Sequence, residues 1–218
     1  MDRQDPQDPM NRIQFSIRET LRIQESFFAE NFDTLHRAFD EVVRVLRAGG
    51  KVLILGNGGS AADAQHLACE LVNRYRVDRP ALPAIALTTD TSILTAIGND
   101  SDYRYVFSRQ IEALGNRGDL VLAITTSGNS ENVLRAIEQA KGMGIRTLVL
   151  TGGDGGRAAA LADLSVCVSG SDQTPRTQET LLVVEHLLCE WIECTLFSSS
   201  KPPHREEQTR EEHEPEKG

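Results

Sequence analysis

Five short apolar runs divide the middle of the chain, and a stretch with helical character follows each of them. The runs cover residues 51–55, 84–87, 120–124, 146–150 and 164–168, and each is nearly continuous, as buried strands are. The stretches between and after them predict helices over residues 60–75, 91–97, 103–114, 130–143, 157–162 and 177–197. Strands that alternate with helices predict a five-stranded parallel sheet with helices on both faces, a three-layer α/β/α sandwich.

A helical pattern also precedes the first strand, over residues 11–48. Its apolar positions form two stripes, Ile13, Ile17, Leu21 and Phe28, then Leu35, Phe39, Val42, Val43 and Leu46. The segment Asn31-Phe32-Asp33 predicts a break between two helices, and Gly49-Gly50 ends the second one. Because these N-terminal helices lie outside the strand–helix alternation, we expect their stripes to pack against another subunit.

The ends of the chain differ from its middle. Residues 1–10 are polar and contain proline, which predicts a flexible arm, and residues 198–218 are charged and nearly free of apolar side chains, which predicts a disordered tail. Residues 11–197 then form a single domain. The chain has 218 residues and a formal charge of −9, so it is a poor match for broad nucleic-acid binding.

The cellular compartment follows from what the sequence lacks. No apolar run is long enough for a membrane span, and the N-terminus has no apolar signal core, so we expect no membrane and a cytoplasmic location. The cysteines Cys69, Cys167, Cys189 and Cys194 show no paired spacing, which favours reduced thiols with a structural role.

Two polar loops follow strands at the edge where open α/β sheets bind ligands. Gly56-Asn57-Gly58-Gly59-Ser60 opens a helix, and its glycines let backbone amides approach an anion. Thr125-Thr126-Ser127-Gly128-Asn129-Ser130 offers hydroxyls before another helix. Each loop has a structural alternative, a tight turn for the first and helix capping for the second. Together they favour a phosphate site that uses amides and hydroxyls, since the domain without its two ends is itself acidic.

Three ionisable residues on predicted helices are candidates for chemistry. His66 and Glu70 are four apart and share one helix face, which is a plausible start for a metal site. His186 stands in the apolar run Leu-Val-Val-Glu-His-Leu-Leu. Taken alone, a helical glutamate is usually a solvated carboxylate, and a histidine among leucines is usually a hydrogen-bonded core residue. The residues by themselves leave both interpretations open.

Six segments together carry a specific likeness: GNGGSAADAQHLACELVNRY, RPALPAIALTTD, AIGND, TTSGNSENV, LTGGDGG and RTQETLLVVEH. Over about residues 11–197 the chain resembles the sugar isomerase (SIS) domain family and, within it, the phosphoheptose isomerases. The resemblance implies a homotetramer with active sites between subunits. It also implies conversion of sedoheptulose 7-phosphate to D-glycero-D-manno-heptose 7-phosphate, the entry to ADP-heptose for lipopolysaccharide core.

The resemblance also implies roles for individual residues. Glu70 would be the catalytic base and His186 the acid, while one zinc per subunit would be held by His66, Glu70, Gln178 and His186. Glu70 cannot easily serve as both tight ligand and free base. Substrate contacts would come from Asn57, Gly58, Gly59, Ser60, Glu70, Asn99, Asp100, Thr125, Thr126, Ser127, Ser130 and Gln178, with Arg74 as a further lining residue. Many relatives carry serine at the position of Thr125, a change that keeps the hydroxyl.

Two non-catalytic alternatives have the same fold. Some relatives bind a replication initiator protein, and they resemble this chain in RPALPAIALTTD and the terminal TLF; that subgroup lacks the catalytic carboxylate and imidazole. A regulatory sugar-phosphate sensor would keep the loops without needing the acid–base pair. Because Glu70 and His186 are both present, the sequence favours the enzyme.

Overall fold

A computed structural model of the chain describes residues 8–197, so most of the predicted arm and the whole predicted tail lie outside the described residues. Five parallel strands form one sheet in the order β2-β1-β3-β4-β5, which confirms the predicted fold class. The strands are β1 (Val52–Gly56), β2 (Ala84–Ala86), β3 (Leu120–Thr125), β4 (Arg146–Gly152) and β5 (Leu164–Val168).

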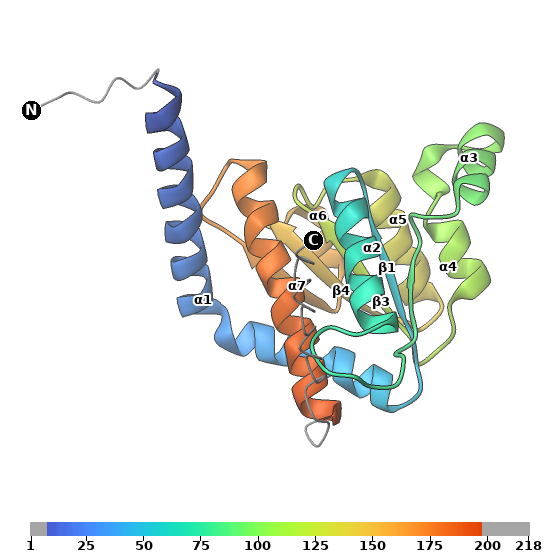
Figure 1. The fold of residues 1–218 in the computed structure, drawn as a ribbon. Coiled ribbons are helices and arrows are strands. Elements are labelled where there is room, and N and C mark those ends of the chain that lie inside the picture. The colour runs from blue at the N-terminus through green and yellow to red at the C-terminus, as the bar shows by residue number, and fades with distance from the viewer. Residues whose placement is uncertain (1–7, 198–218) are drawn as a thin grey trace, which may run out of the picture.

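Helices cover both faces of this sheet (Figure 1). They are α1 (Pro9–Arg47), α2 (Gly59–Val72), α3 (Thr91–Asp100), α4 (Ser108–Leu114), α5 (Glu131–Gly142), α6 (Gly156–Leu161) and α7 (Thr174–Phe197). The predicted helix over 103–114 is a short 3₁₀ turn, Tyr103–Tyr105, followed by α4. Within residues 8–197 no helix is both long enough and apolar enough to cross a membrane.

The core has two halves because strand side chains alternate between the faces of the sheet. Val52 and Ile54 of β1 pack in the half that α1, α2 and α7 close, whereas Leu53 and Leu55 pack in the half that α4, α5 and α6 close. All five residues of β1 and all six of β3 are buried. This burial on both faces explains why the central strands appear in the sequence as continuous apolar runs.

Helix α1 is continuous, so the predicted break at residues 31–33 is wrong. Figure 1 shows a bend in its middle instead. The Asn31 side chain donates to the carbonyl of Phe27 at 2.9 Å, a local bond that competes with the helical ladder and bends the helix without ending it. The helix also begins earlier than predicted, at Pro9, where the Asp8 carboxylate accepts the Met10 amide at 2.9 Å.

The two apolar stripes of α1 have different environments. The second stripe, with Leu35 and Phe39, packs on the sheet and on α7 of the same chain, so for this half the expected packing on another subunit is wrong. The first half remains outside: Ile13, Ile17 and Leu21 are each more than half exposed. The first stripe therefore remains available for a partner.

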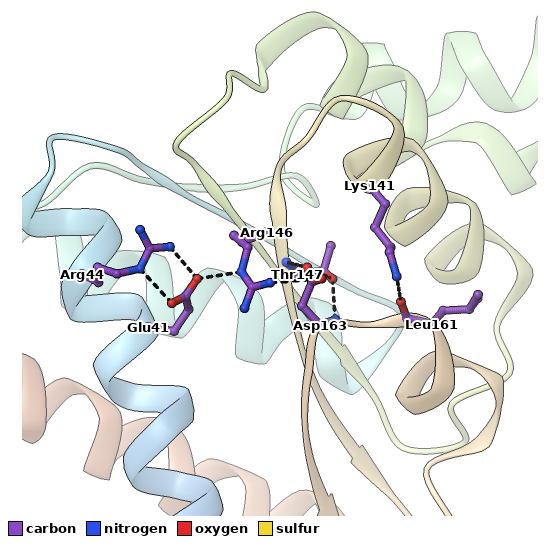
Figure 2. Close-up of polar contacts among 7 residues, drawn as sticks. All are labelled: Glu41, Arg44, Lys141, Arg146, Thr147, Leu161 and Asp163. Carbon is purple, nitrogen blue, oxygen red and sulfur yellow. Dashed lines mark hydrogen bonds and ion pairs between the residues drawn. The ribbon is translucent and has the colours of Figure 1, made fainter.

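A polar network ties α1 to the amino ends of β4 and β5 (Figure 2). Glu41 accepts from Arg44 at 2.6 Å and from Arg146 at 2.9 Å, and Arg146 also meets Asp163 at 3.2 Å. Hydrogen bonds from Arg44, and then from Arg146, lower the pKa of Glu41 to about 2 against the opposing effect of partial burial. These contacts fix the sheet edge opposite the two polar loops.

Candidate active site

The two polar loops lie side by side because β1 pairs with β3. The first loop leaves β1 at Gly56 and turns into α2 through Gly58, whose φ of +58° favours glycine. No side chain caps the start of α2, so the helix presents its first amides at the carboxyl edge of the sheet. The second loop leaves β3 after Thr125 and leads into α5.

A reciprocal pair of side-chain amides joins these loops. Asn57 donates to Asn132 at 2.9 Å, and Asn132 donates back to Asn57 at 2.9 Å. Asn132 is buried in the first turn of α5 and was missed in the sequence, where nothing separates it from an ordinary helical asparagine. The pair fixes the distance between the start of α2 and the start of α5.

The hydroxyls of the second loop differ in exposure. Thr125 is buried at the end of β3, Thr126 and Ser130 are half-buried, and Ser127 is exposed. Ser130 stands at the N-cap of α5 yet makes no capping hydrogen bond with its side chain, so the capping alternative leaves its hydroxyl unused. In the first loop Ser60 is buried and Asn57 is half-buried.

A hollow of about 740 Å³ lies beside the loops, lined by Asn57, Asp102, Tyr103, Arg104, Ser130, Glu131 and Asn132. Arg104, another residue missed in the sequence, brings a cation to this edge, although its guanidinium meets Asp102 at 2.9 Å. Asn99 and Asp100 are the last residues of α3 and not part of a turn. Both are exposed, and Asn99 donates to Asp100 at 2.8 Å.

The predicted acid–base residues both neighbour His66, where α2 packs against α7. His66 Nε2 lies 3.2 Å from Glu70 Oε1, and the rings of His66 and His186 are 5.1 Å apart between centroids. Tyr75, from the loop after α2, stacks on His186 with centroids 5.8 Å apart. Arg74, one residue before it, is exposed. His66, Glu70 and His186 form what we call the α2–α7 triad.

Gln178 does not join the triad within one chain. It lies against Gly59 at the start of α2, where an added Cβ would overlap its side-chain nitrogen. His186 is eight residues further along α7, which is about 12 Å along the helix axis, and Glu70 is about 16 Å from Gly59 on α2. One chain therefore carries two separated groups, the loops with Gln178 and the triad.

A buried carboxyl lies next to His186. Glu185 is only 2% exposed, and neither of its oxygens has a hydrogen-bond partner among the described residues. Burial, and then the nearby charge of Asp63, raises the pKa of Glu185 to about 8. One turn further on, burial raises the pKa of the Cys189 thiol to about 12, which keeps it protonated and unreactive. Cys69 and Cys194 are exposed, so burial does not support the predicted structural role of these two thiols.

The donor atoms of the triad suit zinc, which binds imidazole nitrogen and carboxylate oxygen. The 3.2 Å between His66 and Glu70 is short enough for both to face one ion. In residues 8–197 no three His, Cys, Asp or Glu side chains are already arranged around a metal position. The side chains of the triad would have to rotate to complete a site.

Comparison with known proteins identifies the family. The family model described as SIS domain matches residues 17–152, and the chain belongs to the SIS domain family.

Within that family the chain is similar to phosphoheptose isomerases. It is 54% identical over 182 residues to the one from Desulfovibrio desulfuricans, covering 84% of this chain and 86% of the relative. The solved phosphoheptose isomerase from Neisseria gonorrhoeae superposes with a TM-score of 0.80 at 39% identity, over 84% of this chain and 98% of that one. The solved phosphoheptose isomerase from Francisella tularensis superposes with a TM-score of 0.81 at 36% identity, over 84% of this chain and 97% of that one.

Proposed function

We propose that this protein is an aldose–ketose isomerase that converts sedoheptulose 7-phosphate to D-glycero-D-manno-heptose 7-phosphate. The observation that carries the proposal is the α2–α7 triad, in which His66 contacts both the Glu70 carboxylate and the His186 imidazole, in a chain that also has two polar loops suited to an anion. The similarity to phosphoheptose isomerases supports the choice of substrate. The product would supply ADP-heptose synthesis in the cytoplasm.

The reaction moves one proton between neighbouring carbons. Glu70 takes a proton from C1 of the ketose, which gives an enediol, and the same proton equivalent is returned to C2. His186 donates a proton to the oxygen on C2, and the hydroxyl on C1 then returns one to His186 and becomes the aldehyde oxygen. Atoms and electrons balance without an oxidant. A positioned acid and base typically contribute about 10²- to 10⁴-fold each to such steps.

The phosphate of the substrate would bind at the two loops. The uncapped start of α2 offers amides and a partial positive charge, and the second loop offers the hydroxyls of Thr126, Ser127 and Ser130. The Asn57–Asn132 pair would hold these donors at a fixed separation. Arg104, at the rim of the hollow, would add a cation if it left Asp102.

The separation of the two groups supports an active site shared between chains. In a homotetramer, loops and Gln178 from one copy would face the triad of another. The exposed first stripe of α1 supplies an apolar surface for that assembly, as does a groove lined by Phe28, Phe32, Phe39, Leu187 and Trp191. Light scattering should give four times the chain mass, and a monomer with full activity would contradict this part.

Zinc would be held by His66, Glu70 and His186, with Gln178 supplied from another copy, and a Glu70 carboxylate bound to zinc could act as the base only after leaving the metal. When bound, it would polarise the oxygens of the sugar. Metal analysis of the purified protein tests this directly. About one zinc per chain, lost in His66→Ala, is the expected result, and protein that is active with no bound metal would contradict a catalytic role.

Turnover of sedoheptulose 7-phosphate by the purified protein tests the function. Glu70→Gln keeps the shape of the side chain and removes its basicity, so we expect activity to fall at least 100-fold. The activity of His186→Ala should fall by a similar factor, whereas Glu138→Gln, on the exposed face of α5, should turn over substrate as the wild type does. Normal turnover by Glu70→Gln would remove the proposed base. The two non-catalytic alternatives, initiator binding and sugar-phosphate sensing, require no turnover at all.

A further inference from the structure

A buried carboxylate on α7 holds the loop that follows α2. Glu193 accepts the backbone N–H groups of Tyr75 at 3.0 Å, Arg76 at 2.9 Å and Val77 at 3.0 Å. It also accepts from Nε of Arg79 at 3.1 Å. Three successive backbone amides bound by one carboxylate fix the path of this loop where it passes α7 on its way from α2 to β2 (Figure 1).

Arg79 completes this arrangement from the other end of the loop. Its guanidinium donates to the carbonyls of Glu70 at 2.7 Å, Leu71 at 2.9 Å and Pro80 at 3.1 Å. Both Arg79 and Glu193 are buried, with 8% and 5% of their surface exposed. One ion pair therefore ties the last turn of α2, which carries Glu70, to the far end of α7.

The fixed loop delivers an aromatic ring to the triad. Tyr75, whose own N–H is bound by Glu193, lies on His186 with planes inclined by 26° and centroids 5.8 Å apart. The ring of His66 meets His186 edge-on, at 75° and 5.1 Å. The imidazole of His186 thus contacts two rings, and only one of them comes from a helix. The other depends on the loop.

We propose that Glu193 and Arg79 form a buried anchor that sets Tyr75 against His186, which makes Tyr75 a positioning residue for the isomerase reaction. The inference rests on the proposed function. A buried ion pair is a costly way to stabilise a fold, because apolar residues of similar volume often serve as well. The pair instead fixes the positions of three backbone amides, and through them the position of the Tyr75 ring.

The test combines kinetics with a measurement that needs no substrate. Diethyl pyrocarbonate acylates accessible neutral imidazole, and peptide mass spectrometry follows His186 in each variant against the wild-type protein at the same concentration. Tyr75→Ala should make His186 react several-fold faster and lower kcat about 10- to 100-fold, with KM within about threefold of wild type. Tyr75→Phe keeps the ring and should restore both readouts.

The anchor has its own variant and a matched control. Glu193→Gln removes an acceptor for the amides of Arg76 and Val77, and should expose His186 as Tyr75→Ala does. Glu190→Gln, one turn away, removes only the exposed pair with the Arg76 side chain at 3.1 Å and should change nothing. If Glu193→Gln fails to fold, the Tyr75 variants, which leave the anchor intact, still decide the positioning role.

Three results would overturn the inference: unchanged His186 reactivity and kcat in Tyr75→Ala, a Tyr75→Phe variant as impaired as Tyr75→Ala, or unchanged His186 reactivity in a folded Glu193→Gln. Absence of isomerase turnover in the wild-type protein would instead contradict the proposed function. The acylation of His186 would then still decide whether the anchor positions Tyr75.

Discussion

Replacing Glu185 by glutamine should stabilise the protein, and by more as the pH rises. The folded chain keeps this carboxyl buried and without a hydrogen-bond partner among the described residues, with a pKa of about 8 against 4.5 for an ordinary glutamate. Between these two values the folded state holds a proton that the unfolded chain has lost. The free energy of unfolding must therefore fall as the pH rises through this window.

The size of the effect follows from the two pKa values. They differ by about 3.5, and each pKa unit corresponds to about 1.4 kcal/mol. The free energy of unfolding of the wild type therefore falls by up to about 5 kcal/mol between pH 4.5 and pH 8. At pH 7 the loss is about 3 kcal/mol. Glutamine keeps the shape of the neutral acid and does not titrate. Glu185→Gln should thus match wild type near pH 4.5 and exceed it by these amounts at higher pH.

Urea denaturation followed by circular dichroism, at several pH values and one protein concentration, measures the difference. Glu138→Gln removes an exposed carboxylate from α5 and should track wild type throughout. A stability difference between Glu185→Gln and wild type that stays constant from pH 5 to pH 8 would refute the reasoning. So would a variant that is less stable than wild type at pH 8.

Three further predictions concern other parts of the molecule. Gly59→Ala places a Cβ on the side-chain nitrogen of Gln178, so it should raise KM for the sugar phosphate in steady-state kinetics. Expressed as a free energy, this rise in KM should exceed the loss in the free energy of unfolding. Arg146→Ala leaves Glu41 with one cationic partner and should cost about 1 kcal/mol at pH 7 in urea titrations. That cost should vanish as the pH falls from 4.5 toward 2, where Glu41 becomes protonated. Ile17→Glu adds charge to the exposed first stripe of α1 and should reduce the assembly mass in light scattering; an unchanged mass would place the subunit contact elsewhere.

The sheet could be predicted because its evidence is local. Residues 120–124 are apolar at every position, which is typical of a strand covered on both faces, and the helical patterns on either side of this short run favour a strand. The bend in α1 could not be predicted in the same way. Asn31 can cap a new helix or donate back to Phe27, and packing of the residues on either side decides between the two.

The site divides along the same line. His66 and Glu70 could be paired from their spacing on one helix face. Tyr75, Asn132 and Glu193 could not be found, because each works through a partner at least 75 residues away. A residue whose role is a long-range contact leaves no periodic trace in the sequence.

The amide pair between Asn57 and Asn132 has a consequence for the chemical lifetime of the protein. Asn57 is followed by Gly58, and an asparagine before glycine loses ammonia readily, since the small neighbour lets its backbone nitrogen attack the side-chain carbonyl. Two hydrogen bonds hold that carbonyl and its amide against Asn132, which restricts the side-chain rotation that the attack requires. Folding thus protects the loop from deamidation, and age-dependent inactivation should begin in molecules that have lost this pair.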